Sequence, residues 1–395
     1  MILANARLPE KGPADVEIDG GVIRAIHTPG EAPQDGGRID LGGLLLLPAF
    51  VDGHIHLDKT HWGAPRLPHV EGRSVRERIA AERVARRRVA LPVEARASAL
   101  IRQLIANGTT RARSHVDIDN DVKLANLEAV LRVRETYRDW IDIEIVAFPQ
   151  SGVVAEKGAA NLLADALKTG ADLVGGLDPV GFDGDLKGQL DIVFGLAERF
   201  GKGVDIHLHD PGEEGAAELS DIAARTVAAG MQGRVAASHA FALGSVAPEL
   251  FGETADRLAR ACVAIMTSCP PSAPVPPVRA LREHGVTVFA GSDNIRDCWS
   301  PFGNGDMLDR TAIIAARHEM FTNRELEEAF ALATIEADKA LGDPRRGLHV
   351  RAAADLVALD AASVADAVVD RPRRAFVFRG GRIAAEGGIV SAAVP

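Results

Sequence analysis

The chain has 395 residues, of which 47% are hydrophobic and 4% aromatic, and its formal net charge is −10. The length suits a large domain with a small addition, and the negative charge argues against a protein that holds nucleic acid. Three cysteines cannot form a disulfide framework, and no apolar run approaches the roughly 20 residues of a membrane span. We therefore expect a cytoplasmic protein without nucleic-acid or membrane partners, and the sequence leaves assembly into a homo-oligomer open.

Short strand-like runs separated by glycine turns occupy both ends of the chain. A hairpin pattern covers residues 14–26, and similar runs return at 354–359 and 375–384. We expect a small β-sandwich domain assembled from residues 1–47 and 346–395.

The middle of the sequence, residues 48–345, alternates apolar runs with helical segments, which is the pattern of parallel strands joined by helices. The candidate strands lie near 49–56, 111–117, 142–148, 172–177, 203–208, 233–238, 262–266 and 286–291. The candidate helices lie at 74–107, 121–136, 157–169, 186–201, 214–230, 247–260, 276–284 and 306–319. Eight such units predict an α/β fold, a (β/α)8 barrel, whose active site lies at the carboxyl ends of the strands.

Histidines gather where these predicted strands end. His54 and His56 end the first strand, and their i, i+2 spacing places both side chains on one face of a strand. His207 and His209 end the fifth strand, and His239 ends the sixth. Histidines scattered through loops would not follow the strand count in this way.

Four of the residues at strand ends form a candidate metal site. His54, His56, His207 and Asp293 offer three imidazoles and one carboxylate from three strands. Such a set holds a divalent ion and leaves a coordination position open for water, as in catalytic sites. A metal in such a site lowers the pKa of the water toward neutrality and makes it a nucleophile.

The same residues resemble the signature of the amidohydrolase superfamily over essentially the whole sequence, most closely its cytosine deaminase-like branch. The motifs that carry the resemblance are Asp52-Gly53-His54-Ile55-His56-Leu57-Asp58, Arg113-Ser114-His115-Val116-Asp117, Phe148-Pro149-Gln150, His207, Ser238-His239-Ala240, Gly291-Ser292-Asp293 and Trp299. The resemblance implies one metal ion, zinc or iron, and hydrolytic removal of an amino group from a small heterocycle such as cytosine, a triazine or a related cyclic amidine. Two-metal relatives carry a bridging lysine after the fourth strand, and residues 174–178 contain none.

The resemblance also implies catalytic roles. His239 would orient the water together with Asp293. Cytosine deaminases carry a glutamate where this protein has Asp210, whereas His209 and Lys59 look more like the N-isopropylammelide amidohydrolases. Either His209 or Asp210 could move a proton to the leaving nitrogen, and Asp210 could instead cap the following helix.

Four residues are candidates for substrate binding. The amide of Gln150 both donates and accepts, which suits a cyclic –NH–C=O– edge. Lys59 would hold the ring with it, although it could instead be a surface lysine. Asn294 stands where similar deaminases often carry a second aspartate, and Trp299 would either form a wall of the pocket or belong to the core.

Two other functions remain open at this point. One is a hydrolase that cuts the C–N bond of an amide, in a ring or in a side group, with the same metal. The other is a non-catalytic barrel that binds a ligand, which we disfavour because no residue of the ligand set is missing.

Overall fold

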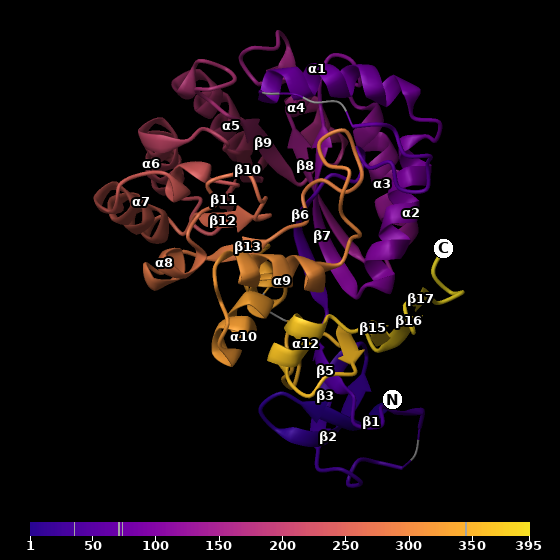
Figure 1. Cartoon of the computed structure of the whole chain (residues 1–395). Coiled ribbons are helices and arrows are strands. Elements are labelled where there is room, and N and C mark those ends of the chain that lie inside the picture. Colours follow the sequence, from indigo (N-terminus) through magenta and orange to yellow (C-terminus); the bar gives the residue numbers. More distant parts are fainter. Residues whose placement is uncertain (35, 70–71, 73, 344–345) are drawn as a thin grey trace.

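The structure is a computed structural model that describes residues 1–34, 36–69, 72, 74–343 and 346–395. It contains an eight-stranded parallel sheet whose strands follow one another in sequence order (Figure 1). These strands are β6 (Phe50–Ile55), β7 (Thr109–Asp117), β8 (Asp142–Phe148), β9 (Leu173–Leu177), β10 (Gly203–His207), β11 (Val235–Ser238), β12 (Ala264–Thr267) and β13 (Val288–Ala290). The predicted α/β barrel is therefore confirmed.

The barrel closes where the first strand meets the segment after the last. The backbone N–H of Asp293 donates to the carbonyl of His54 at 2.7 Å, and Asp52 accepts a hydrogen bond from the backbone N–H of Ser292 at 2.9 Å. A Cβ on Gly53 would lie 2.4 Å from the ring of Phe289, so only glycine fits there. Closure thus places the end of β6 against the residues that follow β13.

Helices surround the strands and follow most of the predicted ranges. They are α2 (Val93–Ala106), α3 (Ala125–Tyr137), α4 (Ala159–Thr169), α5 (Leu186–Phe200), α6 (Gly212–Ala228), α7 (Pro248–Arg260), α8 (Val278–Glu283) and α9 (Met307–Arg317). Shorter or additional elements are η2 (Phe241–Gly244), α10 (Asn323–Leu332), α11 (Ile335–Ala340) and α12 (Val364–Asp370). Among the described residues, no helix has the length and apolar character that a membrane span requires.

The single helix expected over 74–107 is divided into separate elements. Helix α1 (Val75–Ala85) continues into the 3₁₀ turn η1 (Arg86–Arg88), and α2 begins only after Pro92. Proline lacks the N–H that a continuing helix would need, so the backbone takes a new direction there. Helix α1 lies at the end of the barrel opposite the small domain (Figure 1), and its Ile79 packs with Phe148, Leu177 and Phe182 over the strand ends.

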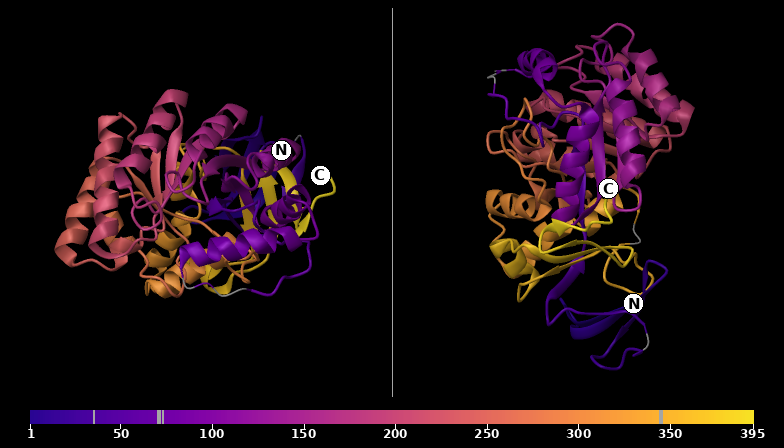
Figure 2. Two further views of the ribbon diagram at one scale, coloured as in Figure 1. Left: turned by 90° about the horizontal axis from the view of Figure 1, so that it is seen from above. Right: turned by 90° about the vertical axis from the view of Figure 1, so that its right-hand side faces the viewer.

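Both ends of the polypeptide contribute to one nine-stranded sheet outside the barrel. Its strands are β1 (Ile2–Leu8), β2 (Gly12–Asp19), β3 (Val22–His27), β4 (Arg38–Asp40), β5 (Leu45–Pro48), β14 (Leu356–Leu359), β15 (Arg374–Arg379), β16 (Arg382–Glu386) and β17 (Ile389–Val390). The first and last segments lie side by side in both views of Figure 2, and β5 pairs antiparallel with β14.

This small sheet encloses a hydrophobic core of its own. Residues from both ends of the sequence, among them Leu3, Leu46 and Phe378, pack together in its interior. At one edge, the N–H of Ile23 in β3 donates to the carbonyl of Ala352 just before β14. The expected β unit from both termini is therefore present, and its hydrogen bonds join the strands in one sheet. Residue 345, the expected end of the barrel domain, lies outside the described residues.

Candidate active site

Strand β6 delivers two buried histidines to the carboxyl end of the barrel. The Nε2 atoms of His54 and His56 lie 3.6 and 3.4 Å from Oδ1 of Asp293, which follows β13. The Nδ1 atom of His56 contacts the backbone carbonyl of His115 at 3.0 Å, which fixes its ring orientation. Three of the four predicted metal ligands therefore converge on one point.

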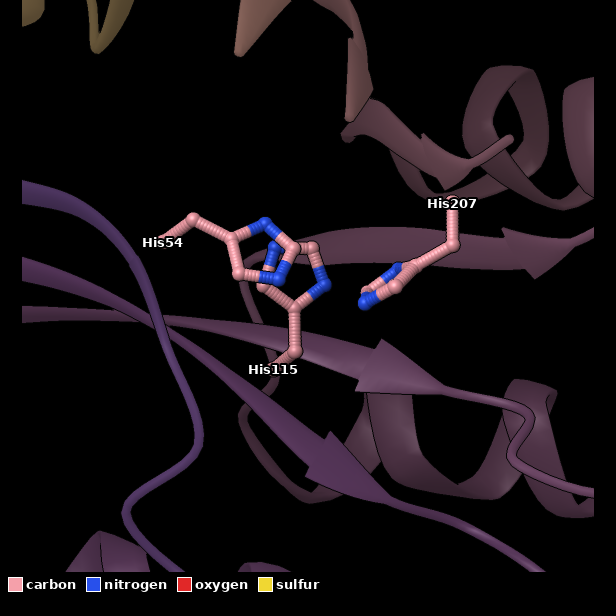
Figure 3. A group of neighbouring side chains, drawn as sticks. All are labelled: His54, His115 and His207. Atoms are coloured by element: carbon pink, nitrogen blue, oxygen red, sulfur yellow. The ribbon is translucent and has the colours of Figure 1, made fainter. Parts of the chain in front are cut away.

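His207, at the end of β10, lies close to both of these histidines. Its ring centroid lies 4.6 Å from that of His54 and 5.5 Å from that of His56. His115 on β7 stacks on His54 with the ring centroids 3.9 Å apart, so His54, His115 and His207 point toward one another (Figure 3). The potential ligand atoms form two overlapping trios, each within 4.8 Å, that share His54: one with His56 and Asp293, the other with His115 and His207.

These imidazoles fit a divalent transition metal. Nε2 of His54 and both ring nitrogens of His207 are buried and have no hydrogen-bond partner among the residues that the structure describes. Leaving such polar atoms unpaired is costly, unless another group binds them. Burial lowers the pKa of His54 and of His207 well below the ordinary value, which keeps both rings neutral, the form that binds metals.

Asp293 and His239 both adopt left-handed backbone conformations beyond the ends of strands: His239 directly follows β11, and Asp293 comes after Gly291 and Ser292, which follow β13. Their φ angles are 62° and 74°, values that non-glycine residues rarely adopt and that tend to occur at functional sites. Burial raises the pKa of Asp293, but the imidazoles of His239, His56 and His54 bring it well below the usual value. Burial lowers the pKa of His239 to about 3, so this ring is neutral beside an ionised carboxylate.

The side chains of the neighbouring residues His209 and Asp210 have different hydrogen-bond partners. The Nδ1 atom of His209 lies 2.9 Å from Oδ2 of Asp178, and its ring stacks on that of His239 with the centroids 4.6 Å apart. Burial lowers the pKa of His209, but Asp178 outweighs this effect and raises it above the ordinary value. Asp210 instead accepts a hydrogen bond from the N–H of Gly181 at 2.7 Å. It does not cap α6, whose N-cap is Pro211 without a side-chain hydrogen bond.

Lys59 is buried inside the mouth of the barrel, with 3% of its side chain exposed. Its ammonium donates to Oε1 of Gln150 at 2.6 Å and lies 3.2 Å from Oδ1 of Asp117. Burial lowers the pKa of Lys59, but Asp117, Glu82 and Asp58 outweigh it and raise the pKa above the usual value. The lysine is therefore a fixed positive charge that contacts the amide predicted to bind substrate.

Trp299 and Asn294 lie in the loop after β13. The indole N–H of Trp299 donates to Glu82 at 2.7 Å, and the Lys59 ammonium is 5.3 Å from the tryptophan ring. The Asn294 amide donates to Oδ2 of Asp297 at 2.7 Å. Trp299 therefore lies at the mouth of the barrel under α1, next to Lys59.

Asp178 and Glu82 belong to the site although the sequence did not predict a role for them. Asp178 follows β9 with a φ of 35° and holds His209, so its place at the end of a strand was the available signal. Glu82 lies on α1 and contacts Lys59 at 3.5 Å and Trp299. No motif marks Glu82, because its role depends on where α1 lies over the barrel.

Comparisons with known proteins identify the family of the chain. The model of the family described as "Amidohydrolase family" matches residues 38–384. The N-isopropylammelide isopropyl amidohydrolase of Pseudomonas sp. (strain ADP) is 34% identical over 398 residues, which is 99% of this chain and 98% of that protein.

Two solved structures are also similar. The N-isopropylammelide isopropylaminohydrolase from Burkholderia multivorans superposes with a TM-score of 0.95 at 43% identity, covering 99% of each chain. The 5-methylcytosine deaminase from Klebsiella pneumoniae, liganded with 5-fluorocytosine, superposes with a TM-score of 0.85 at 29% identity, covering 98% of this chain and 97% of that one. These relatives confirm the predicted class of enzyme, a hydrolase that acts on C–N bonds of cyclic nitrogen compounds. The protein belongs to the amidohydrolase family.

Proposed function

We propose that the protein hydrolytically removes an exocyclic amine, either ammonia or an alkylamine, from an oxo-substituted nitrogen heterocycle of the s-triazine class. The observation that carries this proposal is the 2.6 Å hydrogen bond from the Lys59 ammonium to Oε1 of Gln150. It lies beside the histidine cluster, since the Lys59 ammonium is 5.4 Å from the ring of Phe148, which stacks on His207.

This contact decides which end of the Gln150 amide is offered to a substrate. An ammonium group only donates, so the amide oxygen must face Lys59. In the described residues, no acceptor takes a hydrogen bond from Nε2 of Gln150, which leaves this NH₂ group to donate to a substrate. A ring oxo group, or an unprotonated ring nitrogen, is the complementary acceptor. The two relatives named for N-isopropylammelide favour a triazine over a pyrimidine.

The remaining residues account for the movement of protons. A divalent metal, zinc or iron, held by His54, His56, His207 and Asp293 would lower the pKa of a water molecule toward neutrality. Asp293 and His239 would orient the attacking water and accept its proton. His209, held by Asp178, would donate a proton to the departing amine nitrogen.

The fourth barrel strand supports a single metal ion. A Cβ on Gly175 would lie 2.7 Å from the carbonyl oxygen of Ala147, and one on Gly176 would lie 2.7 Å from Oε1 of Gln189. These positions of β9 therefore have no room for a side chain, and the residue after the strand is Asp178, not a lysine.

The test is turnover by metal-free protein reloaded with zinc or with iron. N-isopropylammelide, cytosine and a pterin are offered separately, and mass spectrometry follows both the ring and the released amine. Release of the amine with the ring intact is the expected result. A ring-opened product would favour the alternative C–N hydrolase, and no turnover by either loaded form would contradict the proposal.

The cellular setting is part of the same proposal. Cys262, Cys269 and Cys298 are free thiols, which suits the reducing cytoplasm. The substrate is a small molecule, and we propose neither a nucleic-acid nor a membrane partner. Size-exclusion chromatography with light scattering would determine whether the protein forms a homo-oligomer.

A further inference from the structure

Behind His54 lies a row of buried polar groups that the proposed reaction does not use. Nδ1 of His54 lies 3.0 Å from the hydroxyl oxygen of Ser238, and that hydroxyl donates to Oδ1 of Asp205 at 2.7 Å. The Arg113 guanidinium donates to Oδ2 of Asp205 at 2.9 Å and to Glu144 at 2.7 Å. His54, Ser238 and Asp205 have no solvent exposure.

The direction of every hydrogen bond in this row is determined. Arginine only donates, so Oδ2 of Asp205 accepts from Arg113. Its other oxygen, Oδ1, accepts from the Ser238 hydroxyl. A serine hydroxyl has a single proton, and here that proton goes to Asp205. The hydroxyl oxygen must therefore accept from His54, whose proton is on Nδ1. Nε2 is then the unprotonated nitrogen, and it is the one that faces Asp293.

We propose that Asp205 and Ser238 are positioning residues that set the tautomer of His54 and so prepare its Nε2 to bind the metal. This inference rests on the proposed metal site. Groups that hydrogen-bond to the second nitrogen of a metal-binding histidine fix its tautomer and orientation, and losing them commonly weakens metal binding by about 10- to 100-fold.

His54 is the proposed ligand whose tautomer is set by side chains, and these side chains can be replaced by mutation. His56 is oriented by a backbone carbonyl, and neither ring nitrogen of His207 has a partner among the described residues. A side-chain substitution in the row behind His54 therefore acts on one ligand and leaves the orienting contact of His56 in place.

The two positioning residues should respond differently to substitution. In Asp205→Asn, the amide keeps its oxygen toward Arg113 and turns its NH₂ toward Ser238. The serine then donates to Nδ1 of His54, which moves the ring proton to Nε2, the nitrogen meant for the metal. In Ser238→Ala, Nδ1 loses its acceptor but neither tautomer is imposed. We expect Zn²⁺ binding to weaken by about 100-fold in the first variant and about 10-fold in the second.

The experiment measures binding of Zn²⁺ to metal-free protein in competition with a chromophoric chelator. Nuclear magnetic resonance of ¹⁵N-labelled histidines reports the tautomer directly, and a purely structural role for Asp205 would not change it. The matched control is Glu144→Gln, which weakens the ion pair of Arg113 at its other end but leaves Asp205, Ser238 and His54 in contact. Its affinity for Zn²⁺ and its histidine tautomers should equal those of the unmodified protein.

Several results would overturn the inference. Unchanged Zn²⁺ affinity in folded Ser238→Ala and Asp205→Asn would do so, as would an equal loss in Glu144→Gln or an unchanged His54 tautomer in Asp205→Asn. Thermal melting of the metal-free proteins establishes folding, and Ser238→Ala carries the test if Asp205→Asn does not fold. Failure of the unmodified protein to bind any divalent metal would instead contradict the proposed metal site itself.

Discussion

Gly291 lies directly against His54. A Cβ at residue 291 would come within 2.5 Å of the His54 Cβ and 2.8 Å of its backbone oxygen. The absence of a side chain at residue 291 therefore lets the first and last strands approach closely enough to form the proposed metal site.

Replacing Gly291 with alanine should displace His54 and destabilise the fold. Inserting a methyl group into a well-packed interior typically costs about 1–3 kcal/mol, because neighbouring groups must shift. Thermal melting and Zn²⁺ affinity should both fall. Gly195→Ala is the control, since Gly195 lies in α5 with nothing within 4 Å of its Cβ position, and a helical alanine should stabilise by about 0.5–1 kcal/mol. Normal Zn²⁺ affinity in Gly291→Ala would show that the closure tolerates a side chain.

Gln150→Glu should preserve the fold but impair turnover. A carboxylate still accepts from Lys59, yet it cannot donate to an oxo group of the ring. Leaving the ring oxo group without its hydrogen bond costs about 1–3 kcal/mol, or roughly a 5- to 150-fold loss in kcat/KM. Steady-state kinetics on the substrate identified by turnover measures this effect, with Gln232→Glu on the surface as control. An unchanged kcat/KM would show that the substrate takes no hydrogen bond from Gln150.

The proton donor can be identified by comparing His209→Gln with Asp210→Asn. His209 stacks on His239 and is held by Asp178, whereas the Asp210 carboxylate binds the N–H of Gly181. We expect kcat to fall by about 10²- to 10⁴-fold in the histidine variant and to change little in Asp210→Asn. The reverse pattern, measured at saturating substrate, would assign the proton transfer to Asp210.

Glu218 should make the protein less stable as the pH rises. Burial, together with the nearby Asp210, raises the pKa of Glu218 from 4.5 to about 9. Below pH 4.5 the Glu218 carboxyl is protonated in both the folded and the unfolded protein, so burying it does not lower the free energy of unfolding through ionisation. Between pH 4.5 and about 9, Glu218 is ionised in the unfolded protein but still protonated in the folded one. The free energy of unfolding therefore decreases as the pH rises through this range.

Glu218→Gln removes that penalty and keeps an oxygen to accept from the N–H of Val180. The variant should melt at a higher temperature than the unmodified protein, by a margin that grows from pH 4.5 to about 9. The exposed Glu327→Gln serves as control and should show no such trend. A margin that does not depend on pH would mean that Glu218 ionises normally.

The sequence was sufficient to predict the barrel and the gathering of its histidines. Apolar runs predict strands, and residues that follow parallel strands meet at one edge, so His54, His56, His207 and Asp293 could be grouped from the sequence alone. Lys59 and Gln150 were both expected at the site, but their direct contact was not. It depends on the path of the loop after β6, which no local pattern describes.

Contacts across the mouth of the barrel could not be predicted from the sequence. The pairing of Glu82 with Lys59 and Trp299 joins three segments that are far apart in sequence. Asp178 follows a predicted strand, yet only the folded barrel brings it against His209. The break between α1 and α2 was missed even though Pro92 marked it, because helical periodicity continues on both sides.

The pairing of β5 with β14 links the proposed metal site to the order of synthesis. Strand β5 leads within two residues into β6, which carries His54 and His56, and the N–H of Ala49 between them donates to the carbonyl of Asp355. A ribosome releases residue 355 long after it releases residue 56. The base of the first barrel strand therefore gains this backbone partner only after residue 355 has been synthesised, so the nascent polypeptide is unable to complete this arrangement earlier.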